Sequence, residues 1–194
     1  MKGVCDGFVE AARLAAGAGF DVLELDMGHG YLLASFLSPA SNQRDDAYGG
    51  DLAGRMRFPL EVLDAVHEQW PGLLAVRLNV VDGTRGGLKL ADGIAIAREL
   101  AEHGCGLVHV VAGQTVPEEP QAAYRRGFLT PFADRVRAEA RVPTLVGGYL
   151  TTPDEANTIV GAGRADLCLL DVPETNLERQ VLTEPEPAAT AVVA

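Results

Sequence analysis

The chain has 194 residues, 47% of them hydrophobic and 22% charged, and its formal net charge is -11, as expected for one soluble globular domain. The acidic excess argues against a nucleic-acid partner, because phosphate backbones repel an acidic surface. We expect no membrane span, because no apolar run reaches roughly 18 residues. We also expect no signal peptide, because the first residues lack an apolar segment.

Helical and strand patterns alternate along the chain, with apolar residues at the spacing typical of each. Asp6 is a candidate cap for the first helix, and an irregular segment from 28 to 50 follows the first strand. In chain order we predict helix 8–16, strand 21–25, helix 52–69, strand 74–78, helix 91–102, strand 107–111, helix 131–140, strand 143–146, helix 153–160 and strand 166–170.

This alternation predicts an α/β fold with parallel strands and right-handed crossovers. Two architectures fit: an open doubly wound sheet, or part of a (β/α)8 barrel, which needs about 250 residues to close. In both, ligands bind at the carboxyl ends of the strands. From residue 183 the tail is rich in Pro, Ala and Glu, and we expect it to be disordered.

Polar side chains at the predicted strand ends are the candidate functional residues. Arg77 lies inside the apolar strand A-V-R-L-N, on the same face as Asn79. A buried guanidinium needs a partner, either a carboxylate of a neighbouring strand or an anionic or carbonyl ligand. His29, between two glycines, either packs in its loop or donates a hydrogen bond to a substrate oxygen.

Three further features are more ambiguous. Gly147 and Gly148 follow a strand and either form a turn or present backbone N–H groups to a phosphate. His109 is predicted to be a satisfied histidine of the core or the barrel interior, whereas His67 and His103 occupy helical positions and are predicted to be solvated.

The loop that leads into the second helix is dense in turn formers and charges. We interpret it as a structured loop fastened by ion pairs of Asp46 with Arg44, Arg55 or Arg57.

Cys5, Cys105 and Cys168 are scattered and lack the spacing of a metal site, so we predict no metal. Three unpaired thiols are typical of the reducing cytoplasm, which is the expected location.

Several motifs occur in the order found in one enzyme family. The runs G-F-D-V-L-E-L-D-M-G-H-G-Y-L-L-A-S-F-L-S-P and N-Q-R-D-D-A-Y-G-G-D-L-A-G-R-M-R-F are followed by A-V-R-L-N, L-V-H-V-V-A-G, P-T-L-V-G-G-Y-L-T-T-P-D-E-A and G-R-A-D-L-C-L-L. Together they resemble the Old Yellow Enzyme family of FMN-dependent NAD(P)H oxidoreductases. In detail they look most like the reductase-type domain fused to salicylyl-CoA or anthraniloyl-CoA monooxygenases.

The resemblance implies a partial (β/α)8 TIM barrel. Residues 1–173 would form about five parallel strands, equivalent to strands four to eight, and residues 174–194 a tail. Strands one to three, which carry part of the flavin site in the family, would be absent. We therefore expect a homodimer, or a complex with a chain that supplies the missing strands.

The resemblance also implies site residues. His29 matches the second of the family's paired substrate-oxygen ligands, Tyr31 the tyrosine that follows them, and Arg77 the arginine at the N1/C2=O edge of the flavin. Gly147 and Gly148 match the backbone phosphate site. The implied cofactors are FMN and NAD(P)H, the latter as reductant.

Two positions depart from the family pattern. Asp26 replaces the first of the paired ligands, His or Asn, and an ionised carboxylate cannot donate a hydrogen bond. We place Asp26 with His29 and Tyr31 in the catalytic part of the site. Leu170-Asp171 replaces the family's Gly-Arg, which reverses the charge expected beside a phosphate.

The resemblance implies an ene-reductase-like activity on a small molecule, with an aromatic-acid CoA thioester as one substrate class. The alternatives are a non-catalytic partial barrel or partner subunit that has lost flavin binding, and an unrelated open flavodoxin-like binding domain.

Overall fold

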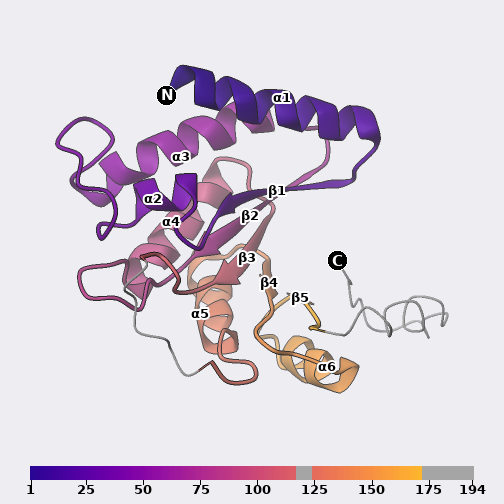
Figure 1. Cartoon of the computed structure of the whole chain (residues 1–194). Coiled ribbons are helices and arrows are strands. Elements are labelled where there is room, and N and C mark those ends of the chain that lie inside the picture. Colours follow the sequence, from indigo (N-terminus) through magenta and orange to yellow (C-terminus); the bar gives the residue numbers. More distant parts are fainter. Residues whose placement is uncertain (117–123, 172–194) are drawn as a thin grey trace.

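The computed structural model describes residues 1–116 and 124–171, in which six helices alternate along the chain with the strands of one parallel sheet (Figure 1). The predicted tail of residues 174–194 lies outside the described residues. The strands are β1 (Val22–Met27), β2 (Leu73–Asn79), β3 (Leu107–Val111), β4 (Thr144–Val146) and β5 (Leu167–Cys168). The helices are α1 (Lys2–Ala18), α2 (Leu32–Leu37), α3 (Leu52–His67), α4 (Leu90–Glu102), α5 (Thr130–Ala140) and α6 (Pro153–Gly161).

The order of the strands decides between the two predicted architectures. The sheet runs β1-β2-β3-β4-β5, and each neighbouring pair is parallel. Every connection therefore advances by one strand in the same direction, as in a barrel, whereas a doubly wound sheet reverses direction at its switch point. The fold is a five-stranded part of a (β/α)8 barrel, and the open flavodoxin-like alternative is wrong.

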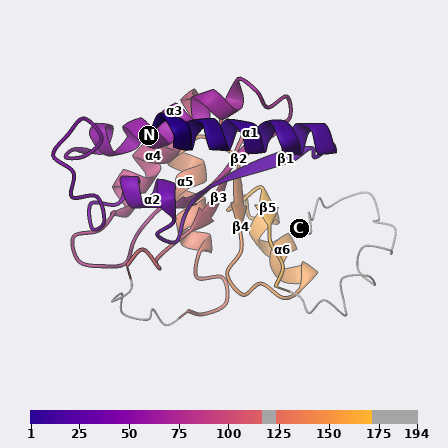
Figure 2. The same cartoon turned by 45° about the horizontal axis from the view of Figure 1, so that its top comes forward.

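The two faces of the sheet differ in chemistry. Val76 and Leu78 of β2, with Val108 and Val110 of β3, are fully buried against the helices and form the centre of the core. The alternate positions face the inside of the partial barrel, where Arg77 and other polar residues lie. The view in Figure 2 shows α1, α3, α4 and α5 along the outer side of the curved sheet.

Helix α1 is longer than the sequence pattern predicted. It begins at Lys2 with Met1 as its N-cap, so Asp6 lies inside the helix and does not cap it. Its first turns contain two glycines and bury no large side chain, so periodicity alone did not mark them. The helix ends at Gly19, which has φ 83°.

Two other boundaries differ from the prediction. The segment 28–50 contains the helix α2, whose single apolar run buries Leu33 and Leu37. Six residues are too few to show a helical period. Strand β5 has only two residues, but main-chain bonds from Asp166 to Thr144 (3.0 Å) and from Leu169 to Val146 (2.9 Å) extend its pairing with β4 to about the predicted length.

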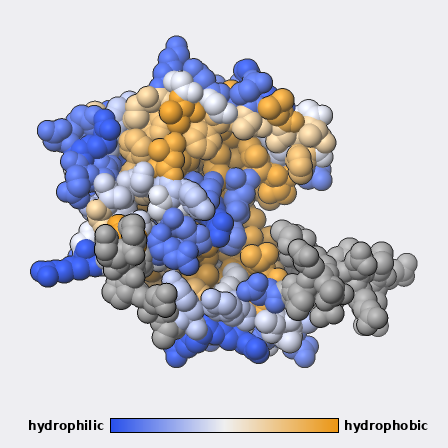
Figure 3. All heavy atoms as spheres, viewed as in Figure 1, coloured by the Kyte–Doolittle hydropathy of each residue, from blue (hydrophilic) through white to orange (hydrophobic). Residues whose placement is uncertain are grey.

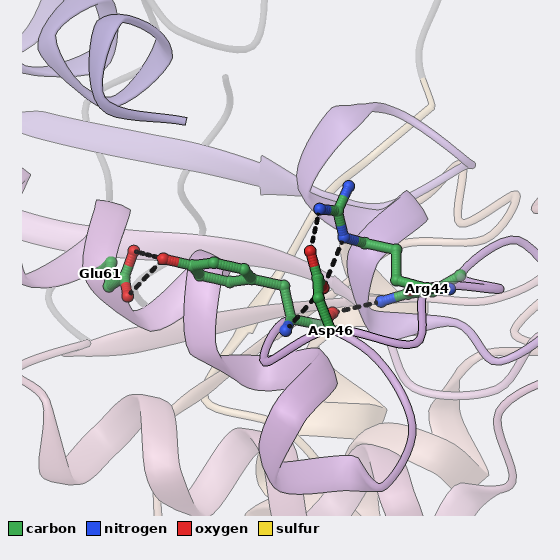
Figure 4. Close-up of polar contacts among 5 residues, drawn as sticks. Arg44, Asp46 and Glu61 are labelled. Carbon is green, nitrogen blue, oxygen red and sulfur yellow. Dashed lines mark hydrogen bonds and ion pairs between the residues drawn. The ribbon is translucent and has the colours of Figure 1, made fainter.

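The loop before α3 is fastened by one of the three predicted ion pairs. Arg44 and Asp46 point toward one another and form an ion pair, and Tyr48 contacts Glu61 of α3 (Figure 4). Hydrogen bonds from Arg44 and from the Tyr48 N–H lower the pKa of Asp46 to about 2.

Arg55 does not pair with Asp46, because its guanidinium is buried and donates to the carbonyls of Leu37 (2.8 Å) and Gly50 (2.6 Å). None of the ion pairs among residues 1–116 and 124–171 involves Arg57.

In the described part of the chain, no helix is long and apolar enough to cross a membrane.

Candidate active site

A pocket of about 230 Å³ lies at the carboxyl ends of the strands, where both predicted architectures placed the ligand. It receives residues from the ends of all five strands or the loops that follow them. They include His29, Arg77, His109, Gly147, Gly148 and Asp171.

Arg77 faces this pocket from β2, close to the carboxyl end of the strand at Asn79. Its Nε atom is buried and has no hydrogen-bond partner. Asp26 is its register neighbour on β1, yet none of the ion pairs among the described residues involves Arg77. The structural salt bridge considered as an alternative is therefore not formed. A buried, unpartnered donor is costly, and a ligand that accepts its hydrogen bond would remove that cost.

His29 is held at the pocket by a strained turn after β1. The residue has φ 49°, and its N–H donates to the Asn79 Oδ1 atom (3.2 Å). A Cβ at Gly28 would lie 2.9 Å from the Val111 side chain, and one at Gly30 would lie 2.6 Å from the Thr115 carbonyl. The close approach of this turn to Val111 and Thr115 thus requires glycine on both sides of His29. Gly30 also has a positive φ of 71°.

The surroundings of His29 keep its imidazole neutral. Burial is the largest cause and lowers the pKa of His29, and the positive charge of Arg77 lowers it further. Asp26 raises this pKa, but by less than Arg77 lowers it, and His109 lowers it slightly. A neutral imidazole donates one hydrogen bond and accepts another, so His29 can donate to a substrate oxygen without carrying a charge.

Asp26 and Tyr31 do not line this pocket. The Asp26 Oδ1 atom accepts from the Gly28 N–H (2.9 Å), so the carboxylate shapes the turn before His29. Tyr31 is the N-cap of α2 and is 61% exposed. Of the six predicted site residues, His29, Arg77, Gly147 and Gly148 come together and these two lie outside.

Local packing explains why Gly148 must be glycine. Gly148 has φ 98°, and a Cβ there would lie 3.1 Å from the ring of Phe128. Its carbonyl accepts from the Gly127 N–H (2.7 Å), which joins this turn to the loop before α5. Of the two interpretations of the glycine pair, the turn is the one that packing supports.

The other histidines are largely where the sequence placed them. His109 is buried on the inner face of the sheet, and its Nδ1 atom lies 3.0 Å from the Glu24 Oε2 atom. His67 is exposed, as predicted. His103 is only partly exposed, because its Nδ1 atom lies 2.7 Å from the Asp64 Oδ1 atom.

A buried polar network behind the His29 turn was not predicted. Asp82, fully buried, accepts hydrogen bonds from Ser38 Oγ (2.6 Å), Thr115 Oγ1 (2.6 Å) and the Leu88 N–H (2.7 Å). Asn79 donates to Thr115 Oγ1 (2.9 Å) and accepts from His29. The one available signal was a carboxylate directly after a buried strand, in N-V-V-D-G.

The described residues contain no group of three or more His, Cys, Asp or Glu side chains that could hold a metal ion. For binding a ligand, the pocket has the guanidinium of Arg77, the neutral imidazole of His29 and the backbone of Gly147 and Gly148.

Comparison with known proteins points to one family. The profile of the NADH:flavin oxidoreductase / NADH oxidase family matches residues 1–186. The NADPH dehydrogenase of Geobacillus thermodenitrificans (strain NG80-2) is 42% identical over 163 residues, which are 84% of this chain and 47% of the relative. The chain thus spans about half the length of the curated relatives it matches.

Two solved structures are also similar. A 2-naphthoyl-CoA reductase in complex with 2-naphthoyl-CoA has a TM-score of 0.78 at 30% identity, covering 85% of this chain and 26% of the reductase chain. Morphinone reductase has a TM-score of 0.70 at 27% identity, and the match covers 96% of this chain and 51% of the morphinone reductase chain.

Proposed function

The chain belongs to the NADH:flavin oxidoreductase / NADH oxidase family, and from that membership we propose that it is a flavin-dependent NAD(P)H oxidoreductase of the ene-reductase kind. Enzymes of this family use FMN with NAD(P)H as reductant. Because the chain spans about half of its relatives, the activity of a whole barrel is a proposal for this chain.

The observation that carries the proposal is the unpartnered Nε atom of Arg77, buried in the pocket that His29 also lines. This donor fits the ring of a flavin, whose electron-rich N1/C2=O edge accepts hydrogen bonds. A fixed guanidinium there would stabilise negative charge on the ring. Arg77 is thus the residue that would hold the ring end of the cofactor.

His29 would bind and polarise the substrate. Its neutral imidazole would donate a hydrogen bond to a carbonyl oxygen and draw electron density from a conjugated double bond. Bound flavin would supply the electron transfer between NAD(P)H and substrate. In this proposal Asp26 orients the turn that carries His29, since its carboxylate binds the Gly28 N–H.

For the substrate we propose a small molecule with an activated double bond, such as an aromatic-acid CoA thioester. The support is a sequence resemblance and the similarity to a reductase whose structure contains 2-naphthoyl-CoA.

We also propose that a second chain completes the inner face of the sheet, either another copy in a homodimer or a separate subunit with the missing strands. Among the described residues, β1 and β5 are edge strands. Val22 and its register partner Leu73 are 49% and 41% exposed on the inner face. Figure 3 shows hydrophobic residues gathered around α1 and β1. Exposed apolar side chains at the start of an open edge strand favour association.

The proposal is tested with the purified full chain. We expect it to bind flavin, seen as a change in flavin absorption and fluorescence, and to oxidise NADPH in the presence of an activated alkene. Arg77→Met should weaken flavin binding at least about tenfold, because a charged hydrogen-bond donor is lost. Arg57→Met, at an exposed arginine of α3, is the matched control. Absence of flavin binding by the parent chain would refute the function.

A second candidate is a non-catalytic partial barrel that acts as a partner subunit. Asp171, which lines the same pocket, favours it, because a carboxylate there opposes a phosphorylated cofactor. The flavin titration above separates the two candidates.

A further inference from the structure

We propose that the pocket of this chain selects a flavin that lacks the phosphate, riboflavin over FMN. The inference rests on the proposed function and concerns the end of the pocket opposite Arg77.

The two ends of the pocket differ in charge. Arg77 of β2 lies at one end with the neutral His29, whereas Gly147, Gly148 and Asp171 come from the ends of β4 and β5, two and three strands away. A flavin whose ring is held by Arg77 extends its side chain along the remaining wall, toward β4 and β5. Any phosphate on that side chain would arrive where the chain supplies a carboxylate.

Asp171 opposes such a phosphate directly. A phosphate monoester carries a charge of about -1.5 to -2 at neutral pH. Repulsion by a nearby carboxylate lowers affinity, and the formal net charge of -11 acts in the same direction at low salt. By contrast, the hydroxyl groups of an uncharged sugar alcohol can donate hydrogen bonds to the Asp171 carboxylate.

The N–H groups at the start of α6, next to the pocket glycines, are already occupied within the chain. The start of α6 follows Gly148 closely, but the N–H groups of Thr151 and Thr152 donate to the Glu155 Oε2 atom at 2.8 Å and 3.1 Å. The nearby Arg126 binds the other oxygen of Glu155 (2.8 Å). These contacts lower the pKa of Glu155 and keep it charged. The helix start therefore holds an internal carboxylate.

The test compares riboflavin and FMN as probes on the full chain, with dissociation constants from flavin fluorescence at low salt. We expect the parent to bind riboflavin at least about tenfold more tightly than FMN. Asp171→Arg should remove or invert this preference. Glu68→Arg makes the same change in charge at an exposed residue directly after α3, outside the pocket, and should leave the preference as in the parent.

The outcomes distinguish this inference from the proposed function. If the parent binds FMN as tightly as riboflavin, or if Asp171→Arg and Glu68→Arg change the preference equally, the inference is wrong and the flavin function stands. If neither flavin binds the parent or the Asp171→Arg variant, the proposed function fails, and the inference fails with it.

Discussion

At the scale of single residues, the pocket places a permanent cation beside a histidine. The positive charge of Arg77 makes protonation of His29 less favourable and lowers the pKa of its imidazole. Burial acts in the same direction and is the larger cause. The site therefore has two adjacent hydrogen-bond donors, the neutral imidazole of His29 and the charged guanidinium of Arg77.

This arrangement predicts how stability depends on pH. Because the pKa of His29 is lower in the folded than in the unfolded chain, the unfolded chain binds the proton first as pH falls below about 6.5. The free energy of unfolding should thus decrease from pH 6.5 down to the folded pKa. In His29→Asn the decrease should be smaller, and asparagine tolerates the positive φ of this position.

Urea unfolding at a series of pH values from 7.5 to 5 measures this difference, the range being set by the roughly 6.5 reference pKa of histidine. His67→Asn, at an exposed histidine, is the matched control. Equal effects of the two substitutions would contradict the role given to the surroundings of His29.

At the scale of elements, glycines inside two helices have opposite expected effects. A Cβ at Gly93 in α4 would lie 2.2 Å from the Val80 carbonyl oxygen, whereas one at Gly7 in α1 would meet nothing within 4 Å. Gly93→Ala should lower the free energy of unfolding by about 1–3 kcal/mol, since overpacking outweighs the gain in helix propensity. Gly7→Ala should raise it by about 0.5–1 kcal/mol.

Urea denaturation of both variants and the parent checks this pair. A stabilised Gly93→Ala variant would show that α4 can shift away from Val80, and would contradict the close approach of Gly93 to that residue.

The types of the helices and strands were predictable from the sequence, but the contacts that hold the His29 turn in place were not. Apolar runs such as Leu107–Val111 mark a strand through local composition alone, and its bounds agree with the structure. The His29 turn depends on Asn79 and Thr115, which lie 50 and 86 positions further along the chain. Contacts of such separation leave no periodic signal. Asp171, by contrast, was expected at the site from its match to the family's Gly-Arg position, and it lines the pocket together with Arg77.

At the scale of the whole molecule, β1 has no partner on its outer edge among residues 1–116 and 124–171, and this open edge predicts association in solution. Light scattering should give the parent chain a mass above that of a monomer. Val22→Lys should reduce it, because a charge on the inner face of an edge strand disfavours pairing. Val160→Lys, on the exposed side of α6, is the control. A parent chain that stays monomeric at high concentration would contradict the completion of the sheet by a second chain.

The Asp82 carboxylate has a consequence for how this pocket can diversify. It binds Ser38 from the segment after α2 and Thr115 from the loop after β3, while lying itself in the loop after β2. Three loops that elsewhere in barrels can be exchanged one at a time are here tied to a single buried anion. Grafting the segment after α2 or the loop after β3 from a related enzyme would leave the buried carboxylate short of a donor, and grafting the loop after β2 would remove the carboxylate itself. New specificities should therefore arise by replacing the three loops as a set.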